Sequence, residues 1–378
     1  MKEGWTVRIV YNSFHGRYTC NPRAIYERLA GTPGLEQVWL ATEDHLDTFP
    51  ADAVTVDIDG AEAASVLEEA DLLVANTHTE VEWAKRPETT YLQTWHGTPM
   101  KRIHHDVLWA PEGRLDLLDR DVEKWDVLLS PNRVSTPRLR KAFAFDRDLW
   151  ETGYPRNDAL LSPDAGDRRR AVRAALGLTG AQTVVLYAPT WRDDEFFADG
   201  DAPIGYGLDV HAYVDAMPED HVLLVRAHNI VSARASRDNP PGVRDVTHYP
   251  DVRDLYLAAD ILVTDYSSVM FDFALTGKPM VFFTYDLDNF RDQVRGFYFD
   301  FVPDAPGPVV RTLEDLVHAL TTVASWRSRY EGRYDTFLAT FSELEDGAAT
   351  DRVLRRLGLV PEQRRRQRRG IEVIRSPR

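Results

Sequence analysis

Thr264-Asp265-Tyr266-Ser267-Ser268-Val269-Met270-Phe271-Asp272 is the stretch of sequence that decides the fold class. It follows Asp260-Ile261-Leu262-Val263, a short apolar run typical of a buried parallel strand, and it leads into a predicted helix over residues 269–275. A strand, a sharp turn and a helix in this order form the repeating unit of an open α/β sheet. The stretch therefore predicts an α/β fold.

The same stretch has chemistry that suits a phosphate group. A helix start leaves backbone N–H groups unpaired and carries partial positive charge, and the hydroxyls of Ser267 and Ser268 add further donors. We therefore expect a pyrophosphate or a similar anion to bind there. The alternative interpretation is that the serines only cap the helix, which is the usual role of serine at this position.

Length and composition limit the class of protein. The 378 residues suit two domains with sizeable cores. The single cysteine, Cys20, excludes an internal disulfide framework and a multi-cysteine metal site. The sequence has no apolar run of membrane-spanning length, and Met1–Trp5 leads into a strand-like segment without a signal-peptide core. We therefore expect an intracellular protein.

The distribution of charge indicates which partners to expect. The formal charge of −15 predicts a surface that repels nucleic acid, so we expect no nucleic-acid partner. Basic residues gather near the end of the chain, above all in Arg364-Arg365-Arg366-Gln367-Arg368-Arg369. This tail would bind an anionic membrane surface. A solvated, disordered end is the alternative.

Short apolar runs alternate with helical spacers along the chain, which is the βαβ pattern of parallel sheets. The predicted strands lie at 7–10, 37–40, 54–56, 71–76, 91–95 and 125–130, and then at 183–187, 222–225, 260–263 and 280–283. Asn21-Pro22 looks like an N-cap and the first residue of a helix. We predict two Rossmann-like, doubly wound domains at 1–160 and 161–345 that face a central cleft, and a helical, basic tail at 346–378.

Thr94-Trp95-His96-Gly97-Thr98-Pro99 is a second stretch with candidate chemistry. His96 comes just past a strand, where open α/β sheets keep reactive groups, and an imidazole is a natural general base for a hydroxyl nucleophile. Gly97 permits a tight turn, and Thr98-Pro99 predicts the start of a helix. A loop histidine with a purely structural role is the alternative.

Arg226 and His228 follow another predicted strand and share one of its sides, so both would reach one phosphate. A protonated His228 would add a second cation or a proton for a leaving phosphate, while a surface ion pair is the alternative. Arg192 also follows a strand and would reach the same cleft. The neighbouring Asp193-Asp194 lacks the further acidic ligands of a metal site. ATP hydrolysis and NAD chemistry have no support, since the P-loop and the dinucleotide fingerprint are both missing.

Six blocks of sequence together resemble the CDP-glycerol glycerophosphotransferases, which build teichoic acids and related capsule polymers. In order, the blocks are Trp95–Pro99, Thr152–Asp158, Ala188–Arg192, Arg226–His228, Thr264–Asp272 and Arg295–Phe301. Their order and spacing agree with the family throughout. The likeness extends from about residue 8 to about residue 345.

The resemblance implies a GT-B architecture and a metal-independent, cofactor-free transfer of glycerol phosphate from CDP-glycerol, with CMP leaving. By position, it makes His96 the base that takes the proton of the acceptor hydroxyl. It assigns the donor's pyrophosphate to Arg226, His228, Ser267, Ser268 and Arg295, with His228 also a catalytic candidate. Gly97, Arg192, Thr264 and Asp265 complete the expected substrate site.

The resemblance also implies partners and a location. The acceptor would be a lipid-linked saccharide or a poly(glycerol phosphate) chain. The enzyme would work on the cytoplasmic face of the cell membrane, held there by its basic tail. Two alternatives stay open at this point: a donor such as CDP-ribitol or a nucleotide sugar on the same fold, and a nonenzymatic polymer-binding protein.

The chain departs from the family pattern in two places. Family polymerases often carry a long additional N-terminal region, and its lack here favours a compact enzyme without separating a primase from a polymerase. After Pro99 the chain reads Met100-Lys101-Arg102-Ile103-His104-His105, where the family pattern leads us to expect a glycine near position 104. His104 and His105 have no strand-end position, so we predict that they are surface residues.

Overall fold

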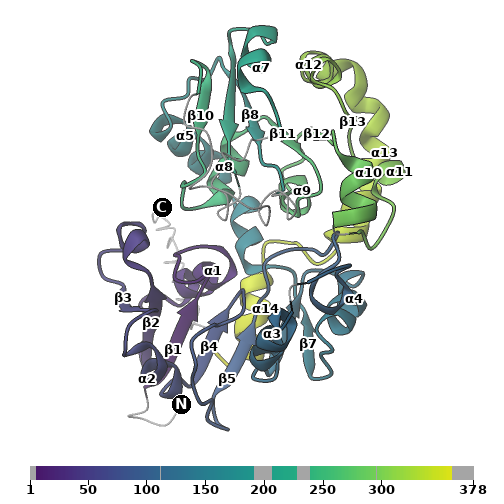
Figure 1. Cartoon of the computed structure of the whole chain (residues 1–378). Helices are drawn as coiled ribbons and strands as arrows, with labels where there is room; N and C mark the ends of the chain where they lie inside the picture. Colours follow the sequence, from purple (N-terminus) through teal and green to yellow (C-terminus); the bar gives the residue numbers. More distant parts are fainter. Residues whose placement is uncertain (1–5, 111, 191–206, 228–238, 295, 360–378) are drawn as a thin grey trace, which may run out of the picture.

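Two parallel sheets organise the chain. The computed structural model describes residues 6–110, 112–190, 207–227, 239–294 and 296–359. Within these residues the first sheet has seven strands, in the order β3-β2-β1-β4-β5-β6-β7, and the second has six, in the order β10-β9-β8-β11-β12-β13. Figure 1 shows them as two α/β domains, one above the other. The predicted fold class is confirmed.

All strand pairs within the two sheets are parallel. The first sheet consists of β1 (Val7–Asn12), β2 (Leu35–Ala41), β3 (Val54–Asp57), β4 (Leu72–Ala75), β5 (Thr90–Gln93), β6 (Val127–Ser130) and β7 (Asp148–Glu151). The second consists of β8 (Thr183–Tyr187), β9 (His221–Val225), β10 (Val243–Asp245), β11 (Ile261–Thr264), β12 (Met280–Phe283) and β13 (Val309–Val310).

Helices connect the strands. Those before β8 are α1 (Cys20–Leu29), η1 (Glu43–Thr48), α2 (Ala63–Glu68), η2 (His104–Asp106), α3 (Arg114–Val122), α4 (Ser135–Ala142), η3 (Pro155–Leu160) and α5 (Ala165–Ala175). Those after β8 are α7 (Val210–Ala216), α8 (Val252–Ala258), α9 (Val269–Ala274), α10 (Leu287–Asn289), η5 (Phe290–Val294), α11 (Phe301–Asp304), α12 (Leu313–Thr321), α13 (Val323–Phe341) and α14 (Ala349–Arg356).

Each sheet is buried on both faces, which explains the continuous apolar runs in the sequence. Consecutive residues of β8 point to opposite sides, so Val184 and Leu186 pack into one hydrophobic cluster, whereas Val185 and Tyr187 pack into another. The sequence patterns missed β7, β10 and β13, which all lie at sheet edges. An edge strand pairs on one side only and is often short and polar, so it leaves no apolar run.

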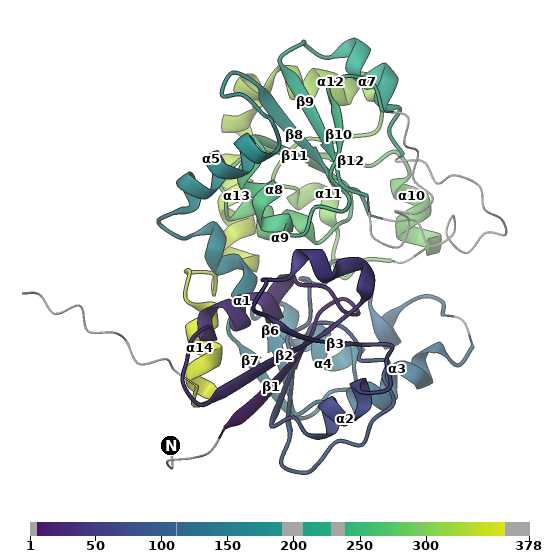
Figure 2. The same ribbon diagram turned by 90° about the vertical axis from the view of Figure 1, so that its left-hand side faces the viewer.

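The last helices tie the second domain back to the first. Helix α13 buries Phe337 and Phe341 in the core of the second domain. Helix α14 buries Val353 and Leu354 in the core of the first domain, where it lies beside α1 (Figure 2). The chain therefore crosses between the domains twice, once between β7 and β8 and once after α13.

A buried ion pair also joins the two domains. The guanidinium of Arg156, in η3, donates to both carboxylate oxygens of Asp272, in α9, and the closest N–O distance is 2.8 Å. The two side chains are only 5% and 6% exposed. Asn157 donates to the same carboxylate at 3.2 Å and to Glu345 at 3.0 Å. Arg156 also donates to the carbonyl of His96 at 2.9 Å, so the pair holds the His96 loop as well.

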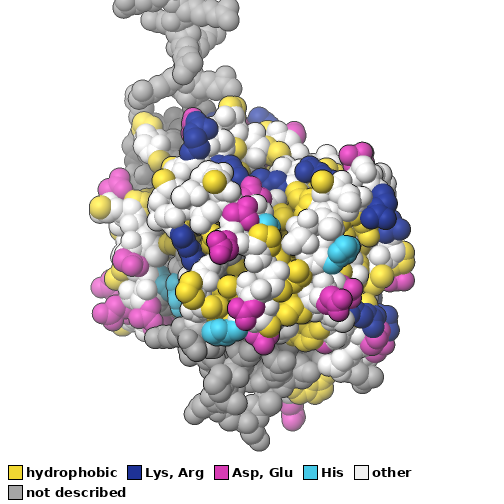
Figure 3. All heavy atoms as spheres, turned by 90° about the horizontal axis from the view of Figure 1, so that it is seen from above, with side chains coloured by type: hydrophobic (Ala, Val, Ile, Leu, Met, Phe, Trp, Pro, Cys, Tyr) yellow, Lys and Arg dark blue, Asp and Glu magenta, His cyan; other side chains and the backbone are white. Residues whose placement is uncertain are grey.

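The surface shows mixed charge where it can be seen. On the end of the second domain that faces the viewer in Figure 3, the described acidic and basic side chains are interspersed, so this face presents no single-signed field to a charged partner. Among the described helices, none has both the length and the apolar character that crossing a bilayer requires.

We predict that Arg156→Ala strongly destabilises the protein. The change leaves the Asp272 carboxylate buried without its cation, which typically costs about 3–5 kcal/mol. Chemical denaturation followed by circular dichroism measures the free energy of unfolding. The matched control is Arg170→Ala, because Arg170 pairs with Asp167 on the surface, where the side chains are 75% and 74% exposed. We expect the control to change stability by no more than about 0.5 kcal/mol. Equal losses in both variants would contradict the importance of the buried pair.

Candidate functional site

Each sheet reverses its strand order at one point, and open α/β sheets bind ligands beside such points. The reversal lies between β1 and β4 in the first sheet and between β8 and β11 in the second. Asn76 follows β4, and Asp265 follows β11. The carboxyl edges of the two sheets meet where Gly97 touches Ser268. The candidate site lies at this junction.

The imidazole of His96 is held in one orientation. Its Nδ1 lies 2.6 Å from the backbone carbonyl oxygen of Asn76. A carbonyl oxygen only accepts hydrogen bonds, so Nδ1 carries the proton and Nε2 keeps its lone pair. The rings of Trp95 and Phe14 pack against the imidazole, with centroids 4.2 and 5.1 Å away. This tautomer leaves Nε2 able to accept a proton from a bound hydroxyl.

The charge state of His96 also suits a base. Burial lowers the pKa of His96 to about 4, and the charges of Arg156 and Lys101 act in the same direction, against the Asn76 carbonyl. The imidazole is therefore neutral at pH 7, as a general base must be before it takes a proton. Trp95, the preceding residue, has a positive φ of 53°. Such backbone strain in a bulky residue is concentrated at functional sites.

Gly97 brings the His96 loop into contact with the second domain. A Cβ atom at position 97 would lie 2.7 Å from Oγ and 3.1 Å from Cβ of Ser268. Only glycine permits so close an approach. The hydroxyl of Tyr154 donates to the Gly97 carbonyl at 3.2 Å and steadies the loop. His96 and Ser268 therefore belong to one site, although they come from different domains.

Ser267 and Ser268 are half-buried at this junction. Ser268 is the N-cap residue of α9, but its side chain makes no capping hydrogen bond. The interpretation of Ser268 as an ordinary helix cap is therefore wrong. Its hydroxyl lies beside Gly97, and its contact with a substrate oxygen stays a prediction.

Thr264 and Asp265 are buried and shape the site from inside the second domain. The hydroxyl of Thr264 donates to the carbonyl of Ala188 at 2.7 Å. The carboxylate of Asp265 accepts from the backbone N–H groups of Thr190 at 2.8 Å and of Tyr266 at 2.5 Å. These bonds tie the loop after β8 to the loop after β11. Direct contact of either side chain with a substrate stays a prediction.

Arg226 directly follows β9 and is half-buried. Its guanidinium donates to the carbonyls of Tyr249 at 2.7 Å and Val246 at 3.2 Å. Burial lowers the pKa of Arg226, and the charge of Arg17 lowers it further. Sequence reasoning assigned no role to Arg17, which comes from the loop after β1 and approaches Arg226 only in the folded chain. The nearby Asp251 carboxylate acts in the opposite direction and raises the pKa of Arg226. Anion binding by Arg226 stays a prediction.

Three predicted site residues lie outside the described residues, namely Arg192, His228 and Arg295. Their roles stay predictions. The described residues that the structure brings to the junction are His96, Gly97, Ser267 and Ser268, and Thr264 and Asp265 hold the neighbouring loops together. Contact of Arg226 with the same ligand stays a prediction.

Two predictions about helix starts are wrong. Thr98-Pro99 begins no helix. Lys101 forms a β-bridge with Phe297 of the second domain, so its backbone pairs with that residue and not within a helix. Asn21 does not cap α1, whose N-cap residue is Thr19. The side chain of Asn21 is fully buried and donates to the carbonyl of Trp95 at 2.9 Å. A polar group buried this deeply needs a partner, so the tertiary bond overrides the local pattern.

The prediction that both His104 and His105 are surface residues is half wrong. His105 is exposed, but His104 is only 7% exposed. The φ of His104 is 48°, in the left-handed region that glycine adopts without cost. This conformation explains why a glycine was expected near the position.

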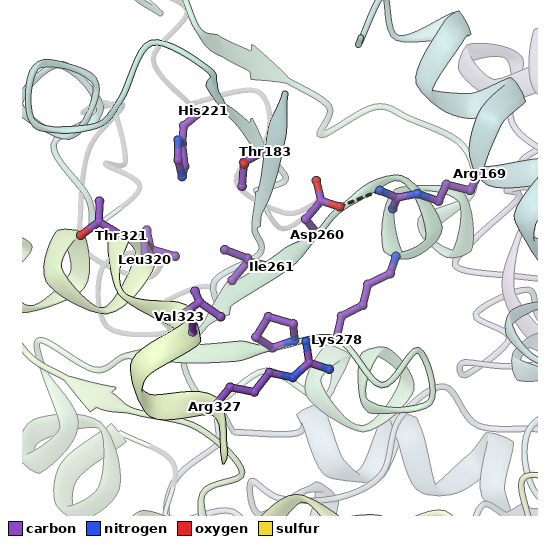
Figure 4. A pocket seen from close by; sticks show the side chains of 12 residues that line it. Arg169, Thr183, His221, Asp260, Ile261, Lys278, Leu320, Thr321, Val323 and Arg327 are labelled. Atoms are coloured by element: carbon purple, nitrogen blue, oxygen red, sulfur yellow. Dashed lines mark hydrogen bonds and ion pairs between the residues drawn. The ribbon is translucent and has the colours of Figure 1, made fainter. Parts of the chain in front are cut away.

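A cavity of about 480 Å³ lies away from the junction, at the amino ends of β8, β9 and β11. Figure 4 shows Lys278 and the ion pair of Arg169 with Asp260 on its wall. The ammonium group of Lys278 donates to three backbone carbonyls at the end of α8. These cations are already paired with protein oxygens, so we do not assign the candidate site to this cavity.

Known proteins resemble this chain in sequence and in fold. The sequence profile described as CDP-Glycerol:Poly(glycerophosphate) glycerophosphotransferase matches residues 6–359. The teichoic acid glycerol-phosphate transferase of Staphylococcus aureus (strain NCTC 8325 / PS 47) is 37% identical over 356 residues, which cover 91% of this chain and 91% of that protein.

Polymerases of teichoic acid are also similar. The teichoic acid poly(glycerol phosphate) polymerase of Bacillus subtilis (strain 168) is 35% identical over 357 residues, which cover 92% of this chain and 48% of the polymerase. The chain therefore spans about half the length of that relative. A solved structure of the wall teichoic acid polymerase TagF matches with a TM-score of 0.84 and 34% identity, over 93% of this chain and 88% of that one.

We predict that His96 stays neutral down to about pH 4 and carries its proton on Nδ1. Burial keeps the ring neutral, and the Asn76 carbonyl, which can only accept a hydrogen bond, fixes the proton on Nδ1. NMR spectra of protein labelled with ¹⁵N-histidine report the tautomer and the pKa, and the His96→Gln variant identifies the signal. A proton found on Nε2 at neutral pH would rule out the proposed acceptor nitrogen.

Proposed function

Because the chain belongs to the CDP-glycerol:poly(glycerophosphate) glycerophosphotransferase family, we propose that it transfers glycerol phosphate from CDP-glycerol to an acceptor hydroxyl in teichoic acid synthesis. The observation that carries the proposal is the contact between the His96 loop and Ser268. The contact supports the proposal because transfer of a phosphoryl group to an alcohol needs a base and anion-binding groups around one point, and His96 and Ser268 are the candidates on its two sides.

In the proposed reaction the acceptor oxygen attacks the phosphorus that bears glycerol. A bond forms between these two atoms while the bond from the same phosphorus to the bridging oxygen of the pyrophosphate breaks. The hydroxyl proton moves to Nε2 of His96, and CMP leaves with the electron pair. The Asn76 carbonyl keeps the imidazole in the tautomer that can accept this proton and stabilises the imidazolium that results.

The developing negative charge needs fixed donors. The backbone at the start of α9 and the hydroxyls of Ser267 and Ser268 would bind the transferred phosphoryl group. Arg226 and Arg17 would add positive charge from the two domains. Preorganised groups of this kind stabilise phosphoryl-transfer transition states electrostatically, which supports the proposal that the reaction is metal-independent.

The proposal also covers the acceptor and the location of the enzyme. We propose a lipid-linked saccharide or a poly(glycerol phosphate) chain as acceptor and peripheral binding to the inner face of the cell membrane. Leu108, Trp109 and Leu117 support this location, because they are 47%, 63% and 52% exposed within one short segment. Exposed aromatic and aliphatic side chains insert into the interfacial region of bilayers, and the basic tail would add attraction to anionic lipid.

We predict that His96→Ala abolishes turnover while donor binding is retained. Loss of a general base typically lowers the rate by about 10²–10⁴-fold. The assay follows CMP release from CDP-glycerol in the presence of a lipid-linked acceptor and a chelator, and calorimetry measures donor affinity. CDP-ribitol and a nucleotide sugar serve as competing donors. Turnover that survives the substitution, or release of nucleotide only from another donor, would disprove the assignment.

Gly97→Ala is predicted to lower turnover by at least about tenfold, because the new methyl group displaces Ser268 or His96, and misplacement by about 1 Å can cost about 10²-fold. Gly180→Ala is the matched control, since a Cβ atom at position 180 meets nothing within 4 Å. Steady-state kinetics and thermal unfolding of both variants separate a catalytic effect from a folding effect. Unchanged kinetics in Gly97→Ala would remove the junction from the reaction.

Membrane binding is predicted to depend on residues 108–117 and on the tail. Leu117→Ser and deletion of residues 361–378 should each weaken cosedimentation with anionic vesicles, the deletion more strongly at low salt. Leu46→Ser is the matched control, because Leu46 is similarly exposed, at 46%. The control should sediment like the unchanged protein. If Leu117→Ser and the deletion do so as well, this location is wrong.

A further inference from the structure

His104, His105 and Asp119 form a cluster of metal-ligand type that the proposed reaction does not use. The Nε2 atoms of His104 and His105 lie 2.8 and 2.9 Å from the same atom, Oδ1 of Asp119. The three ligand atoms lie within 4.8 Å of one another, and the described residues contain no second group of His, Cys, Asp and Glu of this kind. We propose that the cluster binds a divalent transition-metal ion, with Zn²⁺ as the best fit.

The backbone supports a function for the His104 imidazole. Its φ of 48° is left-handed, which is unfavourable for a residue other than glycine. In this conformation the rings of His104 and His105 lie edge to face, with centroids 4.6 Å apart at an angle of 78°. Consecutive side chains thereby converge on one oxygen. Glycine would adopt this backbone conformation without strain, yet the position carries a histidine. Strain of this kind is typical of functional sites.

The distances suit a zinc ion after a small adjustment. Tetrahedral zinc with bonds of about 2.0–2.2 Å places its nitrogen and oxygen ligands about 3.3 Å from one another. The present separations of 2.8 and 2.9 Å would therefore widen by about half an ångström as the ion replaces the shared protons. The side chains of His105 and Asp119 can move, because they are 37% and 34% exposed.

The ligand types select among metals. Two imidazole nitrogens and one carboxylate oxygen favour Zn²⁺ and its neighbours Co²⁺ and Ni²⁺ over Mg²⁺ and Ca²⁺, which prefer oxygen ligands only. Three protein ligands leave one coordination position for water on the exposed side of Asp119.

One ligand is already held in place. The side chain of His104 is only 2% exposed. Its ring stacks on His78 at a centroid distance of 5.5 Å and packs against Phe143 at 5.1 Å. Packing on two sides fixes the direction of Nε2 and lowers the entropy cost of binding an ion.

The ion would stabilise the segment that follows the candidate base. Its histidine ligands come from η2 and its carboxylate from α3, so it would join these elements. The same segment contacts the second domain, where Asp106 accepts from the Tyr298 hydroxyl at 2.8 Å. The proposed role of the ion is therefore to order the acceptor-side loop. The ion takes no part in the reaction at His96.

The test is a titration of the untagged, chelator-treated full chain with Zn²⁺ by calorimetry and with Co²⁺ by visible absorption. We expect one equivalent to bind, a Co²⁺ spectrum of four- or five-coordinate type, and a higher unfolding midpoint with Zn²⁺. His104→Gly removes one ligand and suits the left-handed backbone, so it should fold normally without metal. His104→Gly and Asp119→Asn are tested as separate variants, and each should lower the affinity for Zn²⁺ by more than about 100-fold. This loss exceeds the effect of removing a residue that only hydrogen-bonds to a metal ligand.

His221→Ala is the matched control, because His221 also pairs with an aspartate, Asp220, at 3.0 Å, but it belongs to no group of three potential metal ligands among the described residues. This variant should bind Zn²⁺ like the unchanged protein. The proposal is overturned if the unchanged chain binds no stoichiometric metal, if binding survives in His104→Gly and Asp119→Asn, or if it is lost equally in His221→Ala.

Discussion

The buried pair of Arg156 with Asp272 is the interaction on which the arrangement of the two domains depends. Two desolvated charges are tolerated only where nearly every polar atom finds a partner. Arg156 meets this condition by donating to Asp272, to the carbonyl of His96 and to the sulfur of Cys20. One side chain therefore connects α9, the His96 loop and the start of α1. A buried pair adds little net stability over apolar packing, so we infer that its main contribution is to orient the domains.

This orientation turns two ordinary sheet edges into one site. In each parallel sheet the loops after the strands lie at the same edge. Reactive side chains from several separate loops therefore meet there, although no single long motif contains them. Asn76 orients His96 from a neighbouring strand end, and Gly97 lets the loop touch Ser268 across the domain boundary. A transfer reaction that needs a base on one side and anion donors on the other fits this division between domains.

The local patterns that failed were those in which a tertiary contact competes with a local one. Thr98-Pro99 has the residues of a helix start, but the following backbone pairs with Phe297. Asn21 has the residue type of a cap, but its buried amide reaches the carbonyl of Trp95. A cap contributes about 1 kcal/mol, whereas a buried polar group without a partner costs about 1–3 kcal/mol, so the tertiary bond prevails. The strands β7, β10 and β13 were missed for a different reason, because edge strands need no apolar run.

The sequence by itself determined the α/β class, the two sheets and the family, and it predicted the chemistry of His96 and the serines after β11, because buried strands and strand-end motifs are written in consecutive residues. Only the tertiary structure decided which nitrogen of His96 is available, that Gly97 meets Ser268, and that Arg17 approaches Arg226. Those facts depend on distances between residues far apart in the chain. No local pattern encodes such distances, since they arise only when both sheets have packed and the buried pair has set their relative orientation.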